Sequence, residues 1–438
     1  MRDIVVLIFI GGCLVASLRC AWHGVLVLAI FSYMNPHAFA WGGFVQTFPA
    51  FQTLFFAVVF AALISKEKQA LPKDWRLPVF LLLWLYFFFT TTQAYHPSLA
   101  WDKLWLVTKI YLPYVFTLLL INTREKTYYL IITVAASIGL IAAKGGIFAI
   151  THGFSARVYG PNGTQFYDNN QFALAVLINV PLLILWYRET KNKWIRWALM
   201  AAIPLSFASS LSSWSRGGLL TMIVVTLVIL WHSKRKYLIA PLMVIGIVAA
   251  SYALPDEWFG RMQTIETYEE DESALGRIEV WRDGWNHTLK HPFIGAGFEG
   301  WHYVTKREWH SAYVEIFAEH GFVAFAIWMS LIIGTLVSLT RLPRLTKGIE
   351  GMEWVGNYCY MIRASIIAYM AGGTFLGLAY WDLLYHLIFI SVLVKQFALK
   401  ELSEHTAAQS SGDLKSSRKR STSFVRKSNL SYGSVRYD

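Results

Sequence analysis

The stretch TYYLIITVAASIGLIAAKGGIFAI, residues 127–150, decides the fold class. It carries one charged residue, Lys144, and it is long enough to cross a bilayer as a helix, which takes about 17–25 mainly apolar residues. Similar runs recur along most of the chain, so the sequence predicts an all-α, polytopic integral membrane protein with about twelve or thirteen transmembrane helices. The other expected spans are residues 44–64, 77–92, 104–121, 171–187, 194–212, 217–232, 237–254, 313–340, 355–379 and 382–398, with one or two more within residues 1–43.

The composition of the whole chain agrees with a membrane protein. Of 438 residues, 55% are hydrophobic and only 15% are charged, whereas a soluble protein carries about 25% charged residues. The three cysteines lie in or beside apolar segments without paired spacing, so neither a disulfide nor a zinc site is indicated. Residues 4–18 lack a small-residue cleavage site and are expected to be an uncleaved span.

The placement of basic residues predicts which loops share a side of the membrane. The net charge is +12, and lysine and arginine gather in alternate short loops, as the positive-inside rule expects of cytoplasmic loops. The threading of residues 1–43 stays open, because the two apolar segments there could form two spans, one span or a hairpin. The loops expected outside are residues 93–103, 151–170, 213–216, 255–312 and 380–381.

Four regions follow from this topology. Residues 1–254 form an N-terminal transmembrane bundle and residues 255–312 a large outside loop with interfacial helices. Residues 313–400 form the C-terminal transmembrane helices, and residues 401–438 a disordered, basic cytoplasmic tail. Nucleic-acid binding is not expected, because the remaining basic residues follow membrane topology and form no stripe on a folded domain.

The turn Ser213-Trp-Ser-Arg-Gly-Gly218 is the first candidate for chemistry. Arg216 stands at the outer ends of two helices, where the positive-inside bias should deplete arginine, so we expect a functional role together with Ser215. The alternative is an arginine that reaches the phosphates of lipid headgroups.

The second candidate is the outside segment Leu275–Trp285. Ile278, Trp281, Trp285 and Leu289 form one apolar stripe at helical spacing, which suits a helix that lies on the membrane surface. The segment also carries Arg277 and Arg282, at the edge of this helix; either could grip a phosphate through two hydrogen bonds, or could simply meet lipid headgroups.

His310 is the third candidate, at the start of the span that follows the outside loop. An imidazole with its ordinary pKa near 6.5 is mostly neutral at pH ~7, as a general base must be. The preceding loop His291-Pro-Phe-Ile-Gly-Ala-Gly-Phe298 contains a Gly-x-Gly pattern that is either a weak phosphate-binding signal or a tight turn.

A charged lysine inside an apolar span, such as Lys144, costs free energy on insertion into the membrane. Its presence therefore suggests an ionic partner or an anionic ligand. Asp168 is its candidate counter-ion, or else the cap of the next helix. The acidic run Glu266–Ser273 is expected to be a solvated surface rather than a metal site.

Taken together, these motifs resemble the O-antigen ligase and polymerase superfamily of bacterial envelopes. The resemblance rests on Ser215-Arg-Gly217, on Gly276-Arg277 with Trp281, on the 291–297 loop, on His310-Ser-Ala-Tyr313 and on Glu319-His-Gly321. Three further motifs look like the exosortase A-associated putative O-glycosylation ligase branch: Met34-Asn-Pro-His37, Lys144-Gly-Gly146 and Asp168-Asn-Asn170. His320 departs from the pattern, because many relatives carry an apolar residue there.

The resemblance implies an inverting glycosyltransferase of the bacterial inner membrane with its site facing the periplasm. A glycan would pass from undecaprenyl diphosphate to an acceptor hydroxyl without a metal or another cofactor. Carried over residue by residue, Arg216 and Arg277 would hold the diphosphate and His310 would be the base. Lys144, Asp168, Ser215, Trp281 and Arg282 would help to bind substrate.

The acceptor stays open between three classes. Lipid A-core is the favoured acceptor, another glycan chain would make the protein a polymerase, and a protein would make it an O-oligosaccharyltransferase. A transporter for lipid-linked sugars is the rival from another class, although we find no internal repeat of the kind that transporters show.

Overall fold

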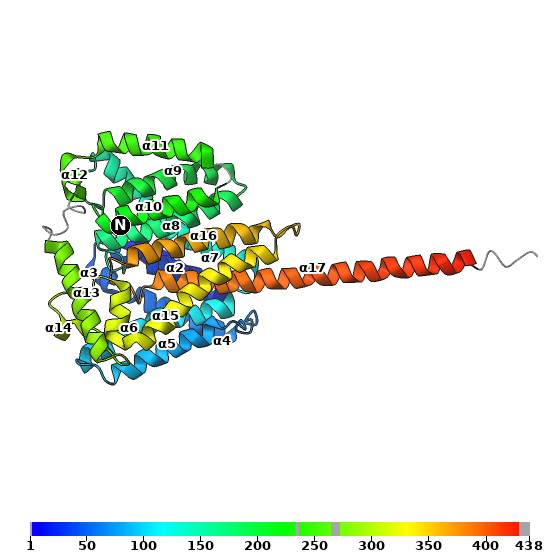
Figure 1. Cartoon of the computed structure of the whole chain (residues 1–438), viewed down its shortest axis with the longest axis horizontal. Coiled ribbons are helices and arrows are strands. Elements are labelled where there is room, and N and C mark those ends of the chain that lie inside the picture. The colour runs from blue at the N-terminus through cyan, green and yellow to red at the C-terminus, as the bar shows by residue number, and fades with distance from the viewer. Residues whose placement is uncertain (1, 234–235, 264–271, 429–438) are drawn as a thin grey trace, which may run out of the picture.

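The computed structural model describes residues 2–233, 236–263 and 272–428, and every regular element in these ranges is a helix (Figure 1). The acidic run proposed as a solvated surface lies almost wholly outside the described residues. The N-terminal helices are α1 (Arg2–Arg19), α2 (Ala21–Tyr33), η1 (Pro36–Phe39), α3 (Gly43–Thr47), α4 (Ala50–Ile64), α5 (Arg76–Thr91), α6 (Pro97–Leu120), α7 (Arg124–Thr151) and α8 (Asn169–Glu189). The remaining ones are α9 (Lys193–Leu211), α10 (Arg216–His232), α11 (Lys236–Ala253), α12 (Asp256–Gln263), α13 (Glu272–Lys290), α14 (Trp301–Val304), α15 (Ala312–Leu345), α16 (Glu353–Gly373) and α17 (Asp382–Ser428).

Each expected span corresponds to a helix. By length and composition, seven helices in the described part of the chain could cross a membrane: α6, α7, α8, α9, α11, α15 and the part of α17 up to Ala408. Shorter apolar helices, α2, α4, α5 and α10, stand at other expected spans. The protein is therefore an all-α, multi-pass membrane protein.

The ends of some helices differ from the prediction. Pro49 separates α3 from α4 inside the expected span 44–64, because proline cannot donate the backbone hydrogen bond of a continuing helix. α16 ends at Gly373, so the connection to α17 runs from residue 374 to 381 and is much longer than the turn expected at residues 380–381. α6 begins at Pro97 and so takes up part of the expected outside loop.

The tail differs as well. α17 continues to Ser428, through most of the segment for which the sequence predicts disorder, and Figure 1 shows it leaving the body of the molecule. Its first turns beyond the apolar part are held by packing, because the Glu401 carboxylate accepts a hydrogen bond of 2.8 Å from the Trp354 indole. Arg124 lies 3.9 Å from the same carboxylate.

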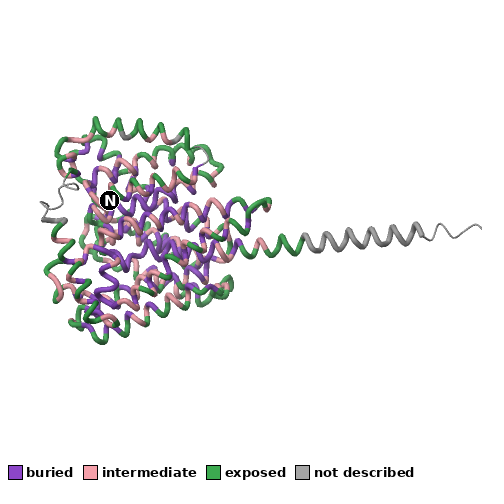
Figure 2. The backbone as a smooth tube through the Cα atoms, viewed as in Figure 1, coloured by how far each residue is buried: buried purple, intermediate pink, exposed green. Residues whose placement is uncertain are grey.

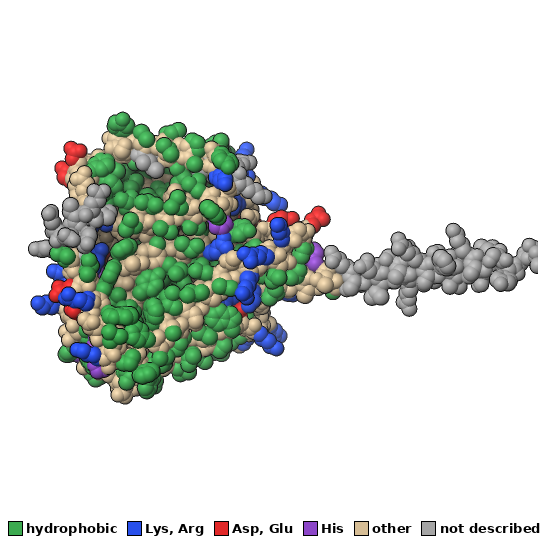
Figure 3. Space-filling view, in the orientation of Figure 1, with side chains coloured by type: hydrophobic (Ala, Val, Ile, Leu, Met, Phe, Trp, Pro, Cys, Tyr) green, Lys and Arg blue, Asp and Glu red, His purple; other side chains and the backbone are tan. Residues whose placement is uncertain are grey.

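Burial and charge follow the pattern of a bilayer-embedded bundle. The centre of the bundle is buried, whereas α11 lies on its outside and is largely exposed (Figure 2). Figure 3 shows hydrophobic side chains over most of the visible face, with lysine and arginine gathered towards its two ends. A protein that spans a membrane needs an apolar surface belt in contact with lipid and charged ends in contact with water and headgroups, and this surface has both.

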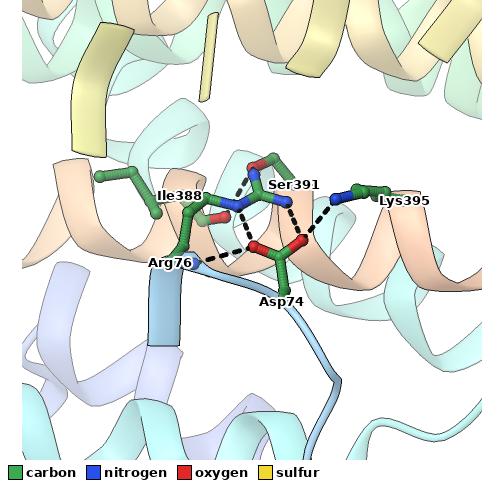
Figure 4. A network of polar contacts seen from close by, with 5 residues as sticks. All are labelled: Asp74, Arg76, Ile388, Ser391 and Lys395. Atoms are coloured by element: carbon green, nitrogen blue, oxygen red, sulfur yellow. Dashed lines mark hydrogen bonds and ion pairs between the residues drawn. The ribbon is translucent and has the colours of Figure 1, made fainter. Parts of the chain in front are cut away.

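One charged end is tied together by a buried ion pair between Arg76 and Asp74 (Figure 4). Arg76 is fully buried; its Nε lies 2.7 Å from Asp74 Oδ1, and its Nη1 donates to Ser391 Oγ of α17 at 2.6 Å. Lys395 reaches Asp74 Oδ2 at 2.9 Å. The network fixes the start of α5 against the middle of α17.

The opposite end, on the left of Figure 1, carries α12, α13 and α14, and α14 packs against α13. α13 packs on α15 through Val280, Gly284 and Thr288, which are buried. Of the predicted apolar stripe, Ile278 and Leu289 stay exposed, whereas Trp281 and Trp285 contact Trp309 and the α15 residues Phe317 and Phe322. An exposed apolar flank on this helix is consistent with the predicted contact to the membrane surface.

Candidate active site

Arg216 begins α10, and the turn before it is fixed by capping. The Ser215 hydroxyl accepts a hydrogen bond of 3.0 Å from the Gly218 amide, which makes Ser215 the N-cap of the helix. Trp214 has φ +58, a left-handed conformation that is unfavourable for a tryptophan. Asn169 of α8 donates to the Ser213 carbonyl at 2.6 Å. The turn therefore holds Arg216 at one place, beside α12, whose Arg261 bonds the Trp214 carbonyl.

His310 also stands in a strained position, with φ +49. Such a conformation costs about 1–3 kcal/mol and persists only where the surroundings hold it. The residue before it, Trp309, is buried and anchored twice: its carbonyl accepts from the Trp281 indole at 3.0 Å, and its own indole donates to Glu319 at 3.1 Å. Trp281, predicted to bind substrate, thus acts directly on the backbone that carries His310.

The surroundings of His310 lower the pKa of its imidazole. Burial lowers its pKa below the ordinary value, and the nearby charges of Arg277 and Arg307 lower the pKa further. Glu308 and Asp168 act in the opposite direction but do not outweigh them. The fold therefore brings Arg277, Asp168 and His310 within electrostatic range of one another, and it favours the form of histidine that can accept a proton.

Phe375, in the long connection between α16 and α17, joins the two arginine-bearing segments. Its ring lies 6.3 Å from that of Trp281 on α13. It also contacts the start of α10, where a Cβ placed on Gly217 would lie 3.3 Å from the Cβ of Phe375. The beginnings of α10 and α13, with Arg216 and Arg277, thus meet across one aromatic side chain.

Three further arginines gather around these segments, and sequence reasoning did not single them out. Arg307 lies against the backbone of Gly276, beside Arg277. The Arg261 Nε donates to the Trp214 carbonyl at 2.9 Å, and the Arg157 guanidinium lies 5.7 Å from the centre of the Trp214 ring. Their positions become visible only once α12, α13 and the loop after α7 fold over the start of α10. A cluster of arginines suits a ligand with several negative charges.

The other predicted substrate-binding residues make different contacts. Asp168 caps α8, because its carboxylate accepts from the Asn170 amide at 2.9 Å; this is the second of its two expected roles. Lys144 is exposed, and its Nζ lies 5.9 Å from the centre of the Phe39 ring. Arg282 is exposed beside Asp283, at 4.0 Å. Substrate binding by Lys144 and Arg282 stays a prediction.

The glycine loop after α13 is a tight turn docked on α15. The Ala296 amide donates to the Ala318 carbonyl at 2.9 Å and the Gly297 amide to the Glu319 carbonyl at 2.8 Å. These carbonyls are accessible because α15 breaks at Gly321, which has φ +76. Since the loop amides are used within the protein, they do not form a phosphate cradle, and the tight-turn alternative holds.

Two buried carboxylates on α15 complete the surroundings of the site. Glu319 accepts from the Tyr380 hydroxyl at 2.6 Å as well as from Trp309, and Glu315 accepts from the Ala379 amide at 2.9 Å. In the sequence, the two glutamates stand four residues apart and so share one face of an apolar helix. Because a carboxylate inside a transmembrane span needs a partner, this spacing could have identified them as site residues. Nearby, Lys103 pairs with Glu299 at 2.7 Å.

Comparison with known families agrees with this geometry. Residues 205–329, which include Arg216, Arg277, His310 and Glu319, match the family described as O-antigen ligase. Residues 1–192 match a family of unknown function, DUF5935. A search of curated proteins finds no significant match. The match over residues 205–329 supports a membrane-embedded, ligase-like glycosyltransferase of the O-antigen ligase superfamily. The match does not distinguish branches within the superfamily, so assignment to the exosortase-associated branch stays a prediction.

Proposed function

We propose that the protein transfers a preassembled glycan from undecaprenyl diphosphate to a hydroxyl group of an acceptor, with inversion at the anomeric carbon. The observation that carries this proposal is the position of His310, whose pKa is lowered by burial and by the charges of Arg277 and Arg307, within the segment that matches the O-antigen ligase family.

The proposed chemistry needs only these side chains. The acceptor oxygen attacks the anomeric carbon, and the bond from that carbon to the diphosphate oxygen breaks. His310 takes the proton of the hydroxyl, a contribution of typically about 10²–10⁴-fold. Arg216 and Arg277 neutralise the charge that develops on the departing diphosphate, the role that a metal ion often has in such reactions.

We place this site on the periplasmic face of the inner membrane. The charged end with α12–α14 carries the site, and the opposite end holds the basic loops that the positive-inside rule assigns to the cytoplasm. No nucleotide sugar is available on the outer side, so the energy for transfer comes from the lipid-linked donor itself.

The acceptor can be identified by a panel assay. Purified protein receives one lipid-linked donor, with EDTA present, and three acceptors in turn: lipid A-core, a growing glycan chain and an unfolded Ser/Thr-rich polypeptide. We expect donor-dependent product with lipid A-core; product with one of the others alone would assign the polymerase or the protein-glycosylation branch.

The same preparation tests the rival transporter. In vesicles without acceptor, an enzyme should leave the lipid-linked donor on the leaflet where it was added. Movement of the donor across the bilayer, together with no product from any acceptor, would contradict the proposed transferase.

A further inference from the structure

A second binding region lies in the half of the chain that matches the family of unknown function. A cavity of about 860 Å³ is bounded by α2, α4, α6, the loop at 162–165 and the start of α17. Except for Asp382 and His386, its lining comes from residues 1–192. It lacks Arg216, Arg277 and His310.

The cavity is open towards the apolar surface of the bundle. Its lining includes Phe56, Leu106 and Leu112, whose side chains are 68%, 45% and 44% exposed. Exposed apolar side chains on transmembrane helices face lipid. We call this region the lateral groove, because a molecule in the bilayer can reach it from the side.

The inner end of the lateral groove is polar. Asp382 and His386 are each only 6% exposed, and both line the cavity. Asp382 Oδ2 accepts from the Ser32 hydroxyl and His386 Nδ1 bonds the Tyr33 hydroxyl at 2.8 Å, while Asp382 Oδ1 and His386 Nε2 have no partner among the described residues. Buried polar atoms without partners are costly, which indicates that a ligand supplies the missing hydrogen bonds.

This polar end lies deep in the bundle. Ser391, nine residues after Asp382 on α17, is bonded to Arg76 at the start of α5 (Figure 4). Nine residues of helix span about 14 Å, roughly half of a ~30 Å bilayer core. Placing an ionisable residue at that depth costs free energy, so such a residue indicates a binding site or a pathway for a polar ligand.

The chemistry of the lining points to a saccharide head. Amides of Asn35 and Gln165, together with Lys109 and Asp382, offer both donors and acceptors, and the Trp105 ring lies beside Lys109. Uncharged sugars match such a mixture, because their hydroxyls both donate and accept and their apolar faces pack on aromatic rings. The Asp382 carboxylate disfavours a diphosphate at the polar end, whereas the arginine cluster around Arg216 and Arg277 favours one.

Two connections link the lateral groove to the arginine cluster. Gln165 lines the groove, and Asp168, three residues later, acts on His310. Phe375 meets Trp281, and the same connection ends at Asp382 in the groove. Two segments of the chain therefore run from the lateral groove to the site proposed for transfer.

We propose that the lateral groove binds the acceptor as a glycolipid, with an uncharged sugar of its head group at Asp382 and His386 and its acyl chains along α4 and α6. This inference rests on the proposed function, since it assigns the two substrates to two regions: the diphosphate donor to the arginine cluster and the membrane-anchored acceptor to the groove.

Photolabelling tests the assignment without requiring transfer. The probe is a glycosyl diacylglycerol with an uncharged sugar head and a diazirine in one acyl chain, added to the full-length protein in nanodiscs and mapped by mass spectrometry. We expect label on residues 51–56 and 105–113, and a loss of about tenfold in Leu112→Trp, which fills the groove, and in Asp382→Ala. Leu140→Trp is the matched control, because Leu140 is exposed on α7 outside the groove. Thermal unfolding checks that each variant is folded.

Each result decides the assignment. Label that is unchanged in Leu112→Trp, or spread evenly over all exposed helices, would overturn it. An undecaprenyl diphosphate probe that labels the same peptides and displaces the glycolipid would also overturn it, by making the groove a donor site. Arg216→Ala separates the two proposals: we expect it to lose transfer and keep the groove label. An active wild-type enzyme without groove label would overturn this inference alone.

Discussion

At the scale of single residues, the site depends on backbone strain held by side chains. Trp214 and His310 both adopt left-handed conformations, and each directly precedes the serine at the N-cap position of a helix. Ser215 caps α10 through its hydroxyl, whereas Ser311 of α15 makes no side-chain capping bond. Both turns are short stretches of adjacent residues, so the sequence alone singled out the 213–218 turn and His310 as candidates. The buried anchors are distant along the chain, as with Glu319 beneath Trp309, and became apparent only in the structure.

The pH dependence of transfer provides a test at this scale. A base must be deprotonated, so kcat/KM should fall as the pH drops through the pKa of His310, which lies below its ordinary value. Arg307 lowers that pKa and Glu308 raises it. Arg307→Gln should therefore move the acid limb to higher pH and Glu308→Gln to lower pH. A limb that shifts the same way in both variants would remove His310 as its source.

Ser215 gives a second residue-scale prediction. Ser215→Ala removes the N-cap hydrogen bond and should cost about 1 kcal/mol of stability while lowering transfer through a misplaced Arg216. Ser215→Asn keeps a capping side chain and should restore most of both, as measured by thermal unfolding and initial rates. Equal loss of transfer in both variants at normal stability would instead indicate direct contact between the hydroxyl and substrate.

At the scale of elements, the hydrophobic runs predicted the transmembrane helices. The ends of the helices and the packing of the 255–312 loop were harder to predict from the sequence. The break of α15 at Gly321 and the docking of the 291–298 loop on it are long-range backbone contacts that no local pattern shows. α16 stops at Gly373 although the apolar run continues, and beyond it the Ala379 amide bonds the Glu315 carboxylate.

Gly297→Ala tests the docked loop. Gly297 has φ +78, and an added Cβ would lie 2.2 Å from that of Ala94. The left-handed backbone alone costs about 1–2 kcal/mol, and the clash adds to it. The melting temperature in detergent should drop clearly, whereas Gly11→Ala, with open space around it, should change little. Equal melting temperatures would contradict the tight docking of this loop.

At the scale of the whole molecule, the two ends of the bundle have separate tasks. One end, with α12–α14, carries the site, and the other is held by the ion pair in Figure 4. The sequence predicted this polarity from charge placement, yet the Asp74–Arg76 contact to α17 joins segments more than three hundred residues apart and could not be read from local patterns.

Removing Asp74 tests that anchor. Asp74→Ala leaves the fully buried Arg76 without its carboxylate, which should cost about 3–5 kcal/mol of folding free energy. Lys395→Ala removes a partner that is 29% exposed and should cost no more than about 1 kcal/mol. Unfolding in nanodiscs measures both, and similar losses in the two variants would show that Arg76 does not depend on Asp74.

The most direct test of the central claim compares glycan transfer by the wild type with that by Arg216→Ala, Arg277→Ala and His310→Ala. Purified proteins receive the same lipid-linked donor and acceptor in EDTA, and folding is checked by thermal unfolding. We predict product from the wild type alone, with all four proteins folded. Transfer at the wild-type rate by any one variant would contradict the role proposed for that residue.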